Sequence, residues 1–252
     1  MRRAYIDGVT EAAADRERIV GIVGGTGPES TIDYYRTLIR RWRRARPDGS
    51  YPRVIISSVE AGRVFRWLGE TNMAAVGREL GSALRELAAA GCGRALIASN
   101  ACHLAFDQID PPPSVPVVHI VDATRDASLA AGHHRLGLLA TTFVASSDLY
   151  SGRFAAAGLE VITPAAGEQT RVHDIYVNEL VAGVIRDESR AALTKQIALM
   201  RERDSIDGVI LGGTELALIL TEPTYEAVPV LNTVEIHVAA AVDWLVEQGP
   251  DR

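Results

Sequence analysis

Short, uninterrupted apolar segments alternate with longer amphipathic stretches from residue 18 onward, and this alternation constrains the fold more than any other feature. A continuous apolar run is typical of a strand that is buried on both faces, as in a parallel sheet covered by helices. Alternation of such strands with helices predicts βαβ units. Eight segments fit this description: Ile19–Val23, Arg53–Ser57, Ala95–Ala98, Val117–Val121, Leu136–Ala140, Leu159–Ile162, Gly208–Leu211 and Val228–Leu231.

Four of the intervening stretches predict helices with one apolar face each. In each stretch apolar residues recur at a spacing of three or four, which places them on one side of a helix. The predicted faces are Ile32, Tyr35, Ile39 and Trp42; Val76, Leu80, Leu84 and Leu87; Val172, Ile175, Tyr176 and Leu180; and Val234, Val238, Ala241 and Leu245.

The order of these elements divides the chain into two similar halves. Each half opens with a strand, a turn and a helix, and the proline-rich segment 111–116 is a natural connector. We therefore expect an α/β protein with two doubly wound, Rossmann-like parallel-sheet domains and a cleft between them. The expected boundaries are a flexible extension over 1–17, a first domain over 18–117 plus 233–252, and a second over 118–232.

Composition limits the cellular compartments and the classes of binding partner that suit this chain. The chain has 252 residues, 47% of them hydrophobic, and a formal net charge of -6, which offers no field to attract nucleic acid or an anionic membrane. Cys92 and Cys102 are too few for a disulfide scaffold, and residues 1–17 lack the apolar core of a signal peptide. We expect a cytoplasmic protein with neither a nucleic-acid nor a membrane partner.

Doubly wound sheets bind ligands beyond the carboxyl ends of their strands. The loops after Val23, Ser57, Ala98, Ala140 and Leu211 should therefore surround one cleft. The first is a glycine-rich turn in which Gly25 and Thr26 precede a helix that starts near Pro28. Its amides favour an anion-binding turn, and a purely structural turn is the alternative. A dinucleotide fingerprint would need a glycine where Ser30 stands.

A second cluster of small and polar residues, Ser99–His103, follows the strand that ends at Ala98. Ser99 and Asn100 can hydrogen-bond a ligand carboxylate. Cys102 is expected in the first turn of the next helix, where the helix start would stabilise a thiolate. His103 is a candidate acid or base, and a histidine that only caps the helix is the alternative.

A third cluster, Gly212–Leu216, follows the strand that ends at Leu211. Gly213 permits close approach to a ligand, while Thr214 is expected to cap a helix that carries Glu215 in its first turn. An ordinary capped helix start is the alternative interpretation. No group of residues has zinc spacing, so we expect no metal.

Together these segments resemble the aspartate/glutamate racemase family, from residue 18 onward and in the family's order. IVGIVGGTGPESTIDYYRTLI is similar to its G-G-M-G-P-x-A-T start, with Thr26 in place of methionine; LIASNACH stands at its C-N-T-A-H segment, and VILGGTEL at its L-G-C-T-E segment. GLLATTFVASSDLYSGRFAAAGLEVITP and VPVLNTVEIHVAAAV follow its second half. The resemblance implies an isomerase of amino-acid metabolism that needs no pyridoxal phosphate or other cofactor, takes a small amino acid or carboxylate and forms a homodimer.

The resemblance also shows where this chain departs from the family. Family racemases use two cysteines on opposite sides of the substrate Cα, one as a thiolate base and one as a thiol acid. Those positions are Ser99 and Gly213 here, and two threonines that help to hold the substrate carboxylate are Ala101 and Val144. Positions that match the family's motifs are retained at Asn100, His103, Thr141, Thr214 and Glu215.

Two functions follow as expectations. Two-thiol racemisation is not available, because serine is a poor substitute for a thiolate and glycine supplies no acid or base. The first expectation is a cofactor-independent enzyme with one-base isomerase, lyase or decarboxylase-like chemistry, with Cys102 as a replacement nucleophile or base beside His103. The alternative is a non-catalytic protein that binds or senses a small acid on the same fold.

Overall fold

The computed structural model describes residues 18–110 and 112–247, so the predicted extension over 1–17 lies outside the described residues. The strands are β1 (Ile19–Gly24), β2 (Arg53–Ser58), β3 (Arg94–Ile97), β4 (Val117–Val118), β5 (Arg135–Leu139), β6 (Glu160–Ile162), β7 (Gly208–Leu211), β8 (Thr224–Tyr225) and β9 (Val228–Asn232). The α-helices are α2 (Pro28–Ala45), α3 (Ala61–Gly69), α4 (Met73–Ala89), α5 (Ile120–Ala130), α6 (Thr142–Ala145), α7 (Ser151–Ala155), α8 (Ala166–Asn178), α9 (Asp187–Asp204), α10 (Leu216–Ile219) and α11 (Thr233–Val246). Two 3₁₀ helices are η1 (Ala101–Gln108) and η2 (Leu180–Ala182).

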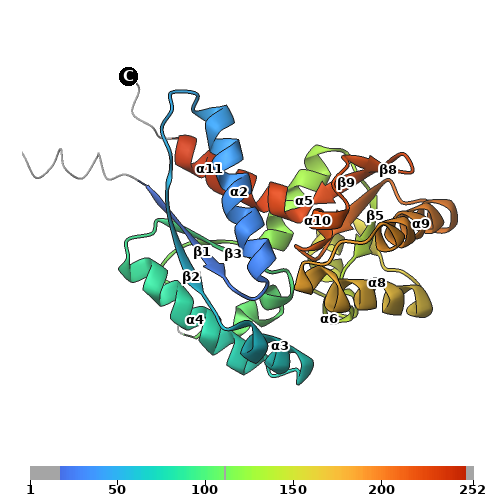
Figure 1. Cartoon of the computed structure of the whole chain (residues 1–252), viewed down its shortest axis with the longest axis horizontal. Helices are drawn as coiled ribbons and strands as arrows, with labels where there is room; N and C mark the ends of the chain where they lie inside the picture. The colour runs from blue at the N-terminus through green and yellow to red at the C-terminus, as the bar shows by residue number, and fades with distance from the viewer. Residues whose placement is uncertain (1–17, 111, 248–252) are drawn as a thin grey trace, which may run out of the picture.

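The strands form two sheets with the same internal order. One sheet runs β2-β1-β3-β4 and the other runs β6-β5-β7-β9, with β8 added at its edge. All pairs are parallel except β8 with β9. Figure 1 shows the two sheets in two lobes that lie side by side, with α2 and α4 in the first lobe and α8 and α9 in the second. The predicted class, two similar doubly wound parallel sheets, is confirmed.

Both sheets are covered by helices on both faces, which explains the continuous apolar runs. In the first lobe, alternate residues of β1 and β3 pack on α3, α4 and η1, and the others pack on α2 and α11. In the second lobe one face of β5 and β7 packs on α8, α9 and α10, and the other on α5 and α7. Because the central strands β1, β3, β5 and β7 are buried on both sides, their sequences carry no polar alternation.

The last helix, α11, ties the chain's end to the first lobe. Val234 and Val238 pack beside Tyr34 and Leu38 of α2, against the first sheet. Buried His237 accepts a hydrogen bond from the hydroxyl of Tyr34 at 2.8 Å, because its Nε2 donates to the carbonyl of Val118 at 2.8 Å. This pair of bonds joins α2, α11 and β4.

The buried face of α2 differs in part from the predicted one. Ile39 and Trp42 pack against the core, partly buried, as expected. Ile32 and Tyr35, expected in the core, are 42% and 45% exposed. Ser30, Tyr34 and Leu38 are buried instead. The prediction was wrong because polar atoms on the true core face are satisfied: Tyr34 bonds His237, and Ser30 bonds the other lobe. A buried polar group with a partner costs little, so hydrophobic spacing alone misplaced the helix.

One strand prediction also needs correction. The strand expected over Val117–Val121 ends at Val118, because His119 caps a helix that begins at Ile120. At the last helix, Asn232 caps α11 by accepting bonds from two backbone amides. The short edge strand β8 was not expected, since two residues are too few for a periodic signal.

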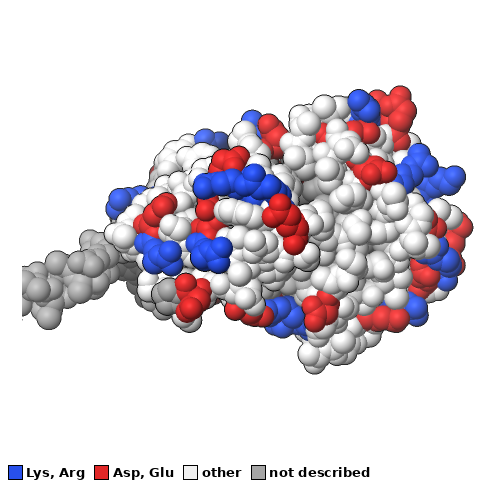
Figure 2. Space-filling view, turned by 90° about the horizontal axis from the view of Figure 1, so that it is seen from below, with Lys and Arg blue, Asp and Glu red and all other residues white. Residues whose placement is uncertain are grey.

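Surface charge is mixed on the face shown in Figure 2. Lys and Arg side chains lie next to Asp and Glu side chains across both lobes, and the middle of this face carries residues of neither kind. Among the described residues, no helix is long and apolar enough to cross a membrane.

Removal of the Tyr34 hydroxyl tests the tie between α2 and α11. Tyr34→Phe leaves buried His237 Nδ1 without its donor, so the free energy of unfolding should fall by about 1–3 kcal/mol in a urea titration. Tyr35→Phe, on the exposed side of the same helix, is the matched control and should change stability by less than about 0.5 kcal/mol. Equal stabilities of the two variants would contradict the role given to this bond.

Candidate active site

A small cavity lies where the carboxyl ends of the two sheets face each other. Its space is about 20 Å³, enough for about one water molecule. The first lobe contributes Thr26, Gly27, Phe65, Leu68, Ser99, Asn100 and Ala101; the second contributes Thr141, Phe143, Val144, Tyr176, Val177, Gly212, Gly213, Thr214 and Glu215. We call this space the interlobe cavity.

Four of the five loops that we expected around a cleft line this cavity. They follow β1, β3, β5 and β7, the central strands of the two sheets, as the rule for doubly wound sheets requires. The loop after β2 does not reach it. The helix that this loop leads into, α3, contributes Phe65 and Leu68, so one wall is apolar.

A chain of hydrogen bonds holds the two lobes together beside the cavity. Ser30 of α2 donates to the hydroxyl of Thr214 at 2.6 Å, and Thr214 donates to Glu215 at 2.9 Å. The other carboxyl oxygen of Glu215 occupies the space that a side chain at position 27 would need. Gly27 therefore permits the close approach of Glu215 from the opposite lobe. Thr214 acts here as a link and not as the predicted helix cap, because α10 begins only at Leu216.

The ring of Tyr176 fills the space above Gly213. A Cβ atom at Gly213 would lie 2.9 Å from Cζ of Tyr176 and closer still to Cε2. A real Cβ does not approach a ring carbon so closely, so a cysteine at this position and Tyr176 in its present place exclude each other. The aromatic side chain thus stands where the resemblance would place the second thiol.

The Tyr176 hydroxyl donates a hydrogen bond to the carboxyl group of Glu215. Both residues are buried, at 7% and 3% exposure. Burial, followed by the negative charge of Glu215, raises the pKa of Tyr176 well above its usual value near 10. The phenol therefore stays protonated at neutral pH and is a hydrogen-bond donor, not a base.

The cluster after β3 contributes Ser99 and Asn100 to the cavity wall. Asn100 uses both ends of its amide, since it accepts from Tyr150 at 2.6 Å and donates to Thr233 at 3.3 Å. It therefore connects the first lobe to α7 and α11. The Ser99 hydroxyl accepts from the backbone of Cys102 at 3.3 Å, which turns the chain into η1.

Cys102 does not have the activated environment that the sequence suggested. It does not line the interlobe cavity and is fully buried in the core of the first lobe. Burial raises the pKa of its thiol, although Ser99 and Thr26 lie within hydrogen-bond reach. The expected stabilisation by a helix start is also missing, because the segment is a 3₁₀ helix packed against the core.

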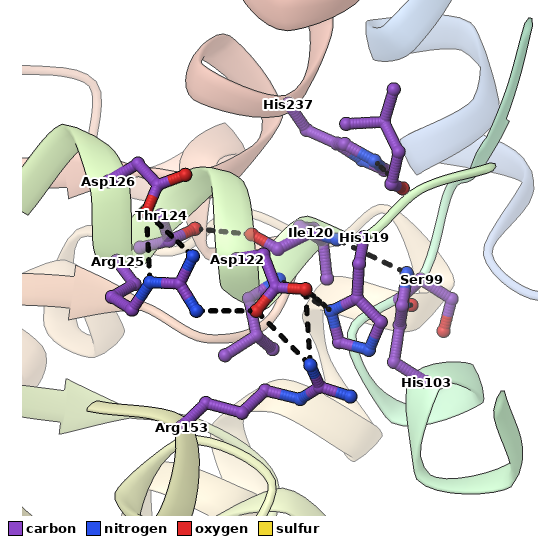
Figure 3. Close-up of polar contacts among 12 residues, drawn as sticks. Ser99, His103, His119, Ile120, Asp122, Thr124, Arg125, Asp126, Arg153 and His237 are labelled. Carbon is purple, nitrogen blue, oxygen red and sulfur yellow. Dashed lines mark hydrogen bonds and ion pairs between the residues drawn. The ribbon is translucent and has the colours of Figure 1, made fainter. Parts of the chain in front are cut away.

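His103 is a buried structural histidine by its contacts. Its Nδ1 donates to the carbonyl of Ser99 at 2.8 Å, and its Nε2 accepts from the backbone of Ile120 at 3.3 Å (Figure 3). Burial, helped by neighbouring His119, lowers its pKa to about 3. Both ring nitrogens are engaged away from the interlobe cavity, so His103 holds η1 against α5 and is not placed to exchange a proton there.

Two further predicted ligand residues differ in their placement. Gly25 lies outside the cavity wall, where its positive φ of 94° and its contact with Val59 make it a packing glycine. Thr141 lines the cavity, and its buried hydroxyl has no hydrogen-bond partner among the residues described. An unsatisfied buried hydroxyl at a cavity wall favours a ligand oxygen or a water as its partner.

Sequence reasoning missed the aromatic and apolar part of the wall. Tyr176 was assigned to the core face of its helix, and Phe65 and Phe143 were not singled out. The glycine at position 213 indicated vacated space, but no local pattern indicated which side chain would enter it. No group of described residues could hold a metal ion.

Comparison with known proteins shows similarity over nearly the whole chain. The model of the Asp/Glu/hydantoin racemase family matches residues 23–241. A proposed Asp/Glu racemase from Yersinia pestis is 30% identical and superposes with a TM-score of 0.81, over 91% of this chain and 99% of that one. An aspartate racemase homologue from Pyrococcus horikoshii is 32% identical, with a TM-score of 0.77 over the same shares. An arylmalonate decarboxylase shares the fold at 16% identity and a TM-score of 0.53, over 93% of this chain and 96% of that one.

A double-mutant cycle tests the packing of Tyr176 on Gly213. Gly213→Ala should lower the free energy of unfolding by about 1–3 kcal/mol, because the new methyl group must displace the ring. In a Tyr176→Ala background the same change should cost much less, which gives a coupling energy above about 1 kcal/mol. Gly167→Ala, a helical glycine with open space around it, is the control and should not destabilise. Additive effects at positions 213 and 176 would refute the contact.

Proposed function

Because the chain belongs to the Asp/Glu/hydantoin racemase family, we propose that it is a cofactor-independent enzyme acting at the carbon beside a carboxylate of a small acid. Its proton transfer is one-sided, and the reaction is of the lyase type, in which carbon dioxide leaves and a proton takes its place. The observation that carries this proposal is the position of Tyr176, whose ring fills the space above Gly213.

Racemisation needs a base on one side of the α-carbon and an acid on the other. The two positions that the family resemblance assigns to this pair hold Ser99 and Gly213. A serine hydroxyl is far too weak an acid to serve as a base without an activating partner, and His103 is turned away from the cavity. Among the described residues of the cavity wall, the carboxyl group of Glu215 is already held by Thr214 and Tyr176, so we infer that none of them begins the reaction by removing a proton from carbon.

Tyr176 supplies the acid of such an acid–base pair. Its raised pKa keeps the phenol protonated at neutral pH, so it is present as the acid and not as a base. The carbanion that forms when carbon dioxide leaves is a far stronger base than a phenolate, and it can therefore take this proton. A site with an acid and no base suits a substrate that forms its carbanion without deprotonation. In decarboxylation the C–C bond breaks, carbon dioxide leaves without the electron pair, and that pair takes a proton from the Tyr176 hydroxyl. The phenolate then regains a proton from water.

The walls of the cavity indicate the class of substrate. The Thr141 hydroxyl has no partner among the described residues and is available to a substrate carboxylate. Phe65, Leu68 and Val144 form apolar surface that suits a substituent less polar than that of aspartate. We infer a small malonate-type diacid with an apolar substituent. The shared fold with an arylmalonate decarboxylase is consistent with this inference.

Entry of such a substrate requires the lobes to separate. A space of about 20 Å³ holds one water and no diacid, so the Ser30–Thr214 contact must open before binding. Closure would then exclude water and strengthen the interaction of the substrate with Tyr176 and Thr141.

The two buried free cysteines fit a reducing compartment, and we propose that the protein works in the cytoplasm.

The test is incubation in deuterium oxide with phenylmalonate, methylphenylmalonate, aspartate and glutamate. We expect release of carbon dioxide from a malonate, with deuterium incorporated on one face as shown by NMR and chiral chromatography. Tyr176→Phe keeps the ring over Gly213 but removes the donor, so turnover should fall by about 10²–10⁴-fold. Tyr51→Phe, which changes an exposed tyrosine, should leave turnover unchanged.

Two results would overturn the proposal. Interconversion of both enantiomers of an amino acid would show a two-sided racemase. Saturable binding of a diacid without turnover, in the native protein and in Tyr176→Phe alike, would show a non-catalytic binding protein. This second function is favoured by one observation, namely that the residues lining the closed cavity include no cysteine.

A further inference from the structure

Three buried histidines lie around the segment that carries the chain from the first lobe to the second. This segment, residues 118–121, runs from the end of β4 in the first sheet to the start of α5, which packs on the second sheet. We call it the crossover. The rings of His103 in η1 and His119 in the crossover have centroids 4.6 Å apart, and His237 of α11 lies 6.0 Å from His103.

Two of these histidines hold the crossover only while they are neutral. Nε2 of His103 accepts from the amide of Ile120 at 3.3 Å, and Nδ1 of His119 accepts from the amide of Val121 at 3.3 Å. Figure 3 shows both rings beside the start of α5. An amide N–H can only donate, so the nitrogen that faces it needs a free lone pair. A proton on either nitrogen would break the bond and set two N–H groups against each other.

His237 holds the crossover in a different way. Its Nε2 donates to the carbonyl of Val118 at 2.8 Å, and its Nδ1 accepts from the hydroxyl of Tyr34. A hydroxyl can turn and accept instead, so a proton on Nδ1 would leave both contacts possible. The contacts that depend on a neutral ring are therefore those of His103 and His119.

The groups around these two rings do not stabilise a positive charge on them. The titratable and charged neighbours are His237 of α11 and Tyr34 of α2 behind it, Asp122 and Arg125 of α5, Arg153 of α7, Asp107 of η1, and Asp148, which precedes α7. Asp107 and Asp148 are exposed to water. The carboxylate of Asp122 lies 3.9 Å from Nδ1 of His119, but it already accepts from Arg125 and Arg153.

Burial, followed by the other ring for His103 and by Arg153 for His119, lowers the pKa of each of these histidines to about 3. A histidine in water has a pKa near 6.5. An opened crossover therefore takes up protons below about pH 6.5, whereas the closed form stays neutral until about pH 3. The closed form is fully stable above about pH 6.5 and loses stability as the pH falls from there toward 3.

We propose that His103 and His119 form a pH-sensitive latch, which fixes the crossover while both rings are neutral and releases the start of α5 when they are protonated. The chain passes between the lobes a second time, from β9 to α11, and α11 packs against α5. The two passages together form the hinge between the lobes. Release of the latch loosens this hinge, so the interlobe cavity opens more readily in mildly acidic solution.

The test is amide hydrogen exchange of the full, ¹⁵N-labelled chain near pH 7 and near pH 5, with each rate divided by that of a free peptide at the same pH. This ratio, the protection factor, should fall at Ile120 and Val121 by about 20–30-fold for each histidine that takes up a proton, and so by about several hundred-fold for both. Up to about 1 M urea should not change exchange at these two amides, because a local opening exposes little surface. The amide of Val23, in the central strand β1, should exchange faster in urea.

His119→Asn is the matched variant. Asparagine is a good helix cap and does not titrate, so it can hold the Val121 amide at either pH. The fall in protection should then shrink to about 20–30-fold, the share of His103 alone. His134→Asn is the control, since that side chain is 84% exposed, and it should keep the native fall.

Two results would overturn the latch. One is an equal fall in protection for the native chain and for His119→Asn, or no fall in either. The other is exchange of Ile120 and Val121 that matches Val23 in rate and in urea dependence, which would show only global unfolding. The measurement needs neither substrate nor turnover, so the latch and the proposed decarboxylation can fail separately.

Discussion

The hydrogen bond from Ser30 to Thr214 joins the first helix of one lobe to the loop that follows the central strand of the other. The bonds continue from Thr214 to Glu215, which also accepts from Tyr176. One series of polar contacts therefore positions four side chains from both lobes, beside a cavity with room for about one water molecule. Because buried polar groups need partners, loss of any one of them would release the others.

Two glycines make this arrangement possible. Gly27 leaves room for the carboxyl group of Glu215, and Gly213 leaves room for the ring of Tyr176. The packing of Tyr176 on Gly213 has a chemical consequence. A phenol stands where the family resemblance places a thiol, which could either accept or donate a proton. The chain keeps the family's fold, and under the proposed function its proton transfer becomes one-sided.

Burial on two faces could be predicted from the sequence, and it located the strands and the loops that line the cavity. The face that a helix turns to the core was harder to predict. Tyr34 of α2 points inward because His237, far away in the chain, accepts a hydrogen bond from its hydroxyl. The same limit applies to the site. Gly213 marked a missing group, but the contact with Tyr176 depends on how α8 packs on β7, which no local pattern encodes. Cys102 looked reactive from its neighbours in sequence, whereas its neighbours in space are core residues.

A crystal structure with phenylmalonate bound would test the central claim most directly, namely that Tyr176 stands at the second acid–base position as the proton donor. We expect one carboxylate on the Thr141 hydroxyl. We also expect the ring of Tyr176 still to cover Gly213, with its hydroxyl about 3–3.5 Å from the substrate's central carbon. A structure in which Tyr176 has swung out of the cavity, so that the face above Gly213 is empty or holds the substrate itself, would contradict it.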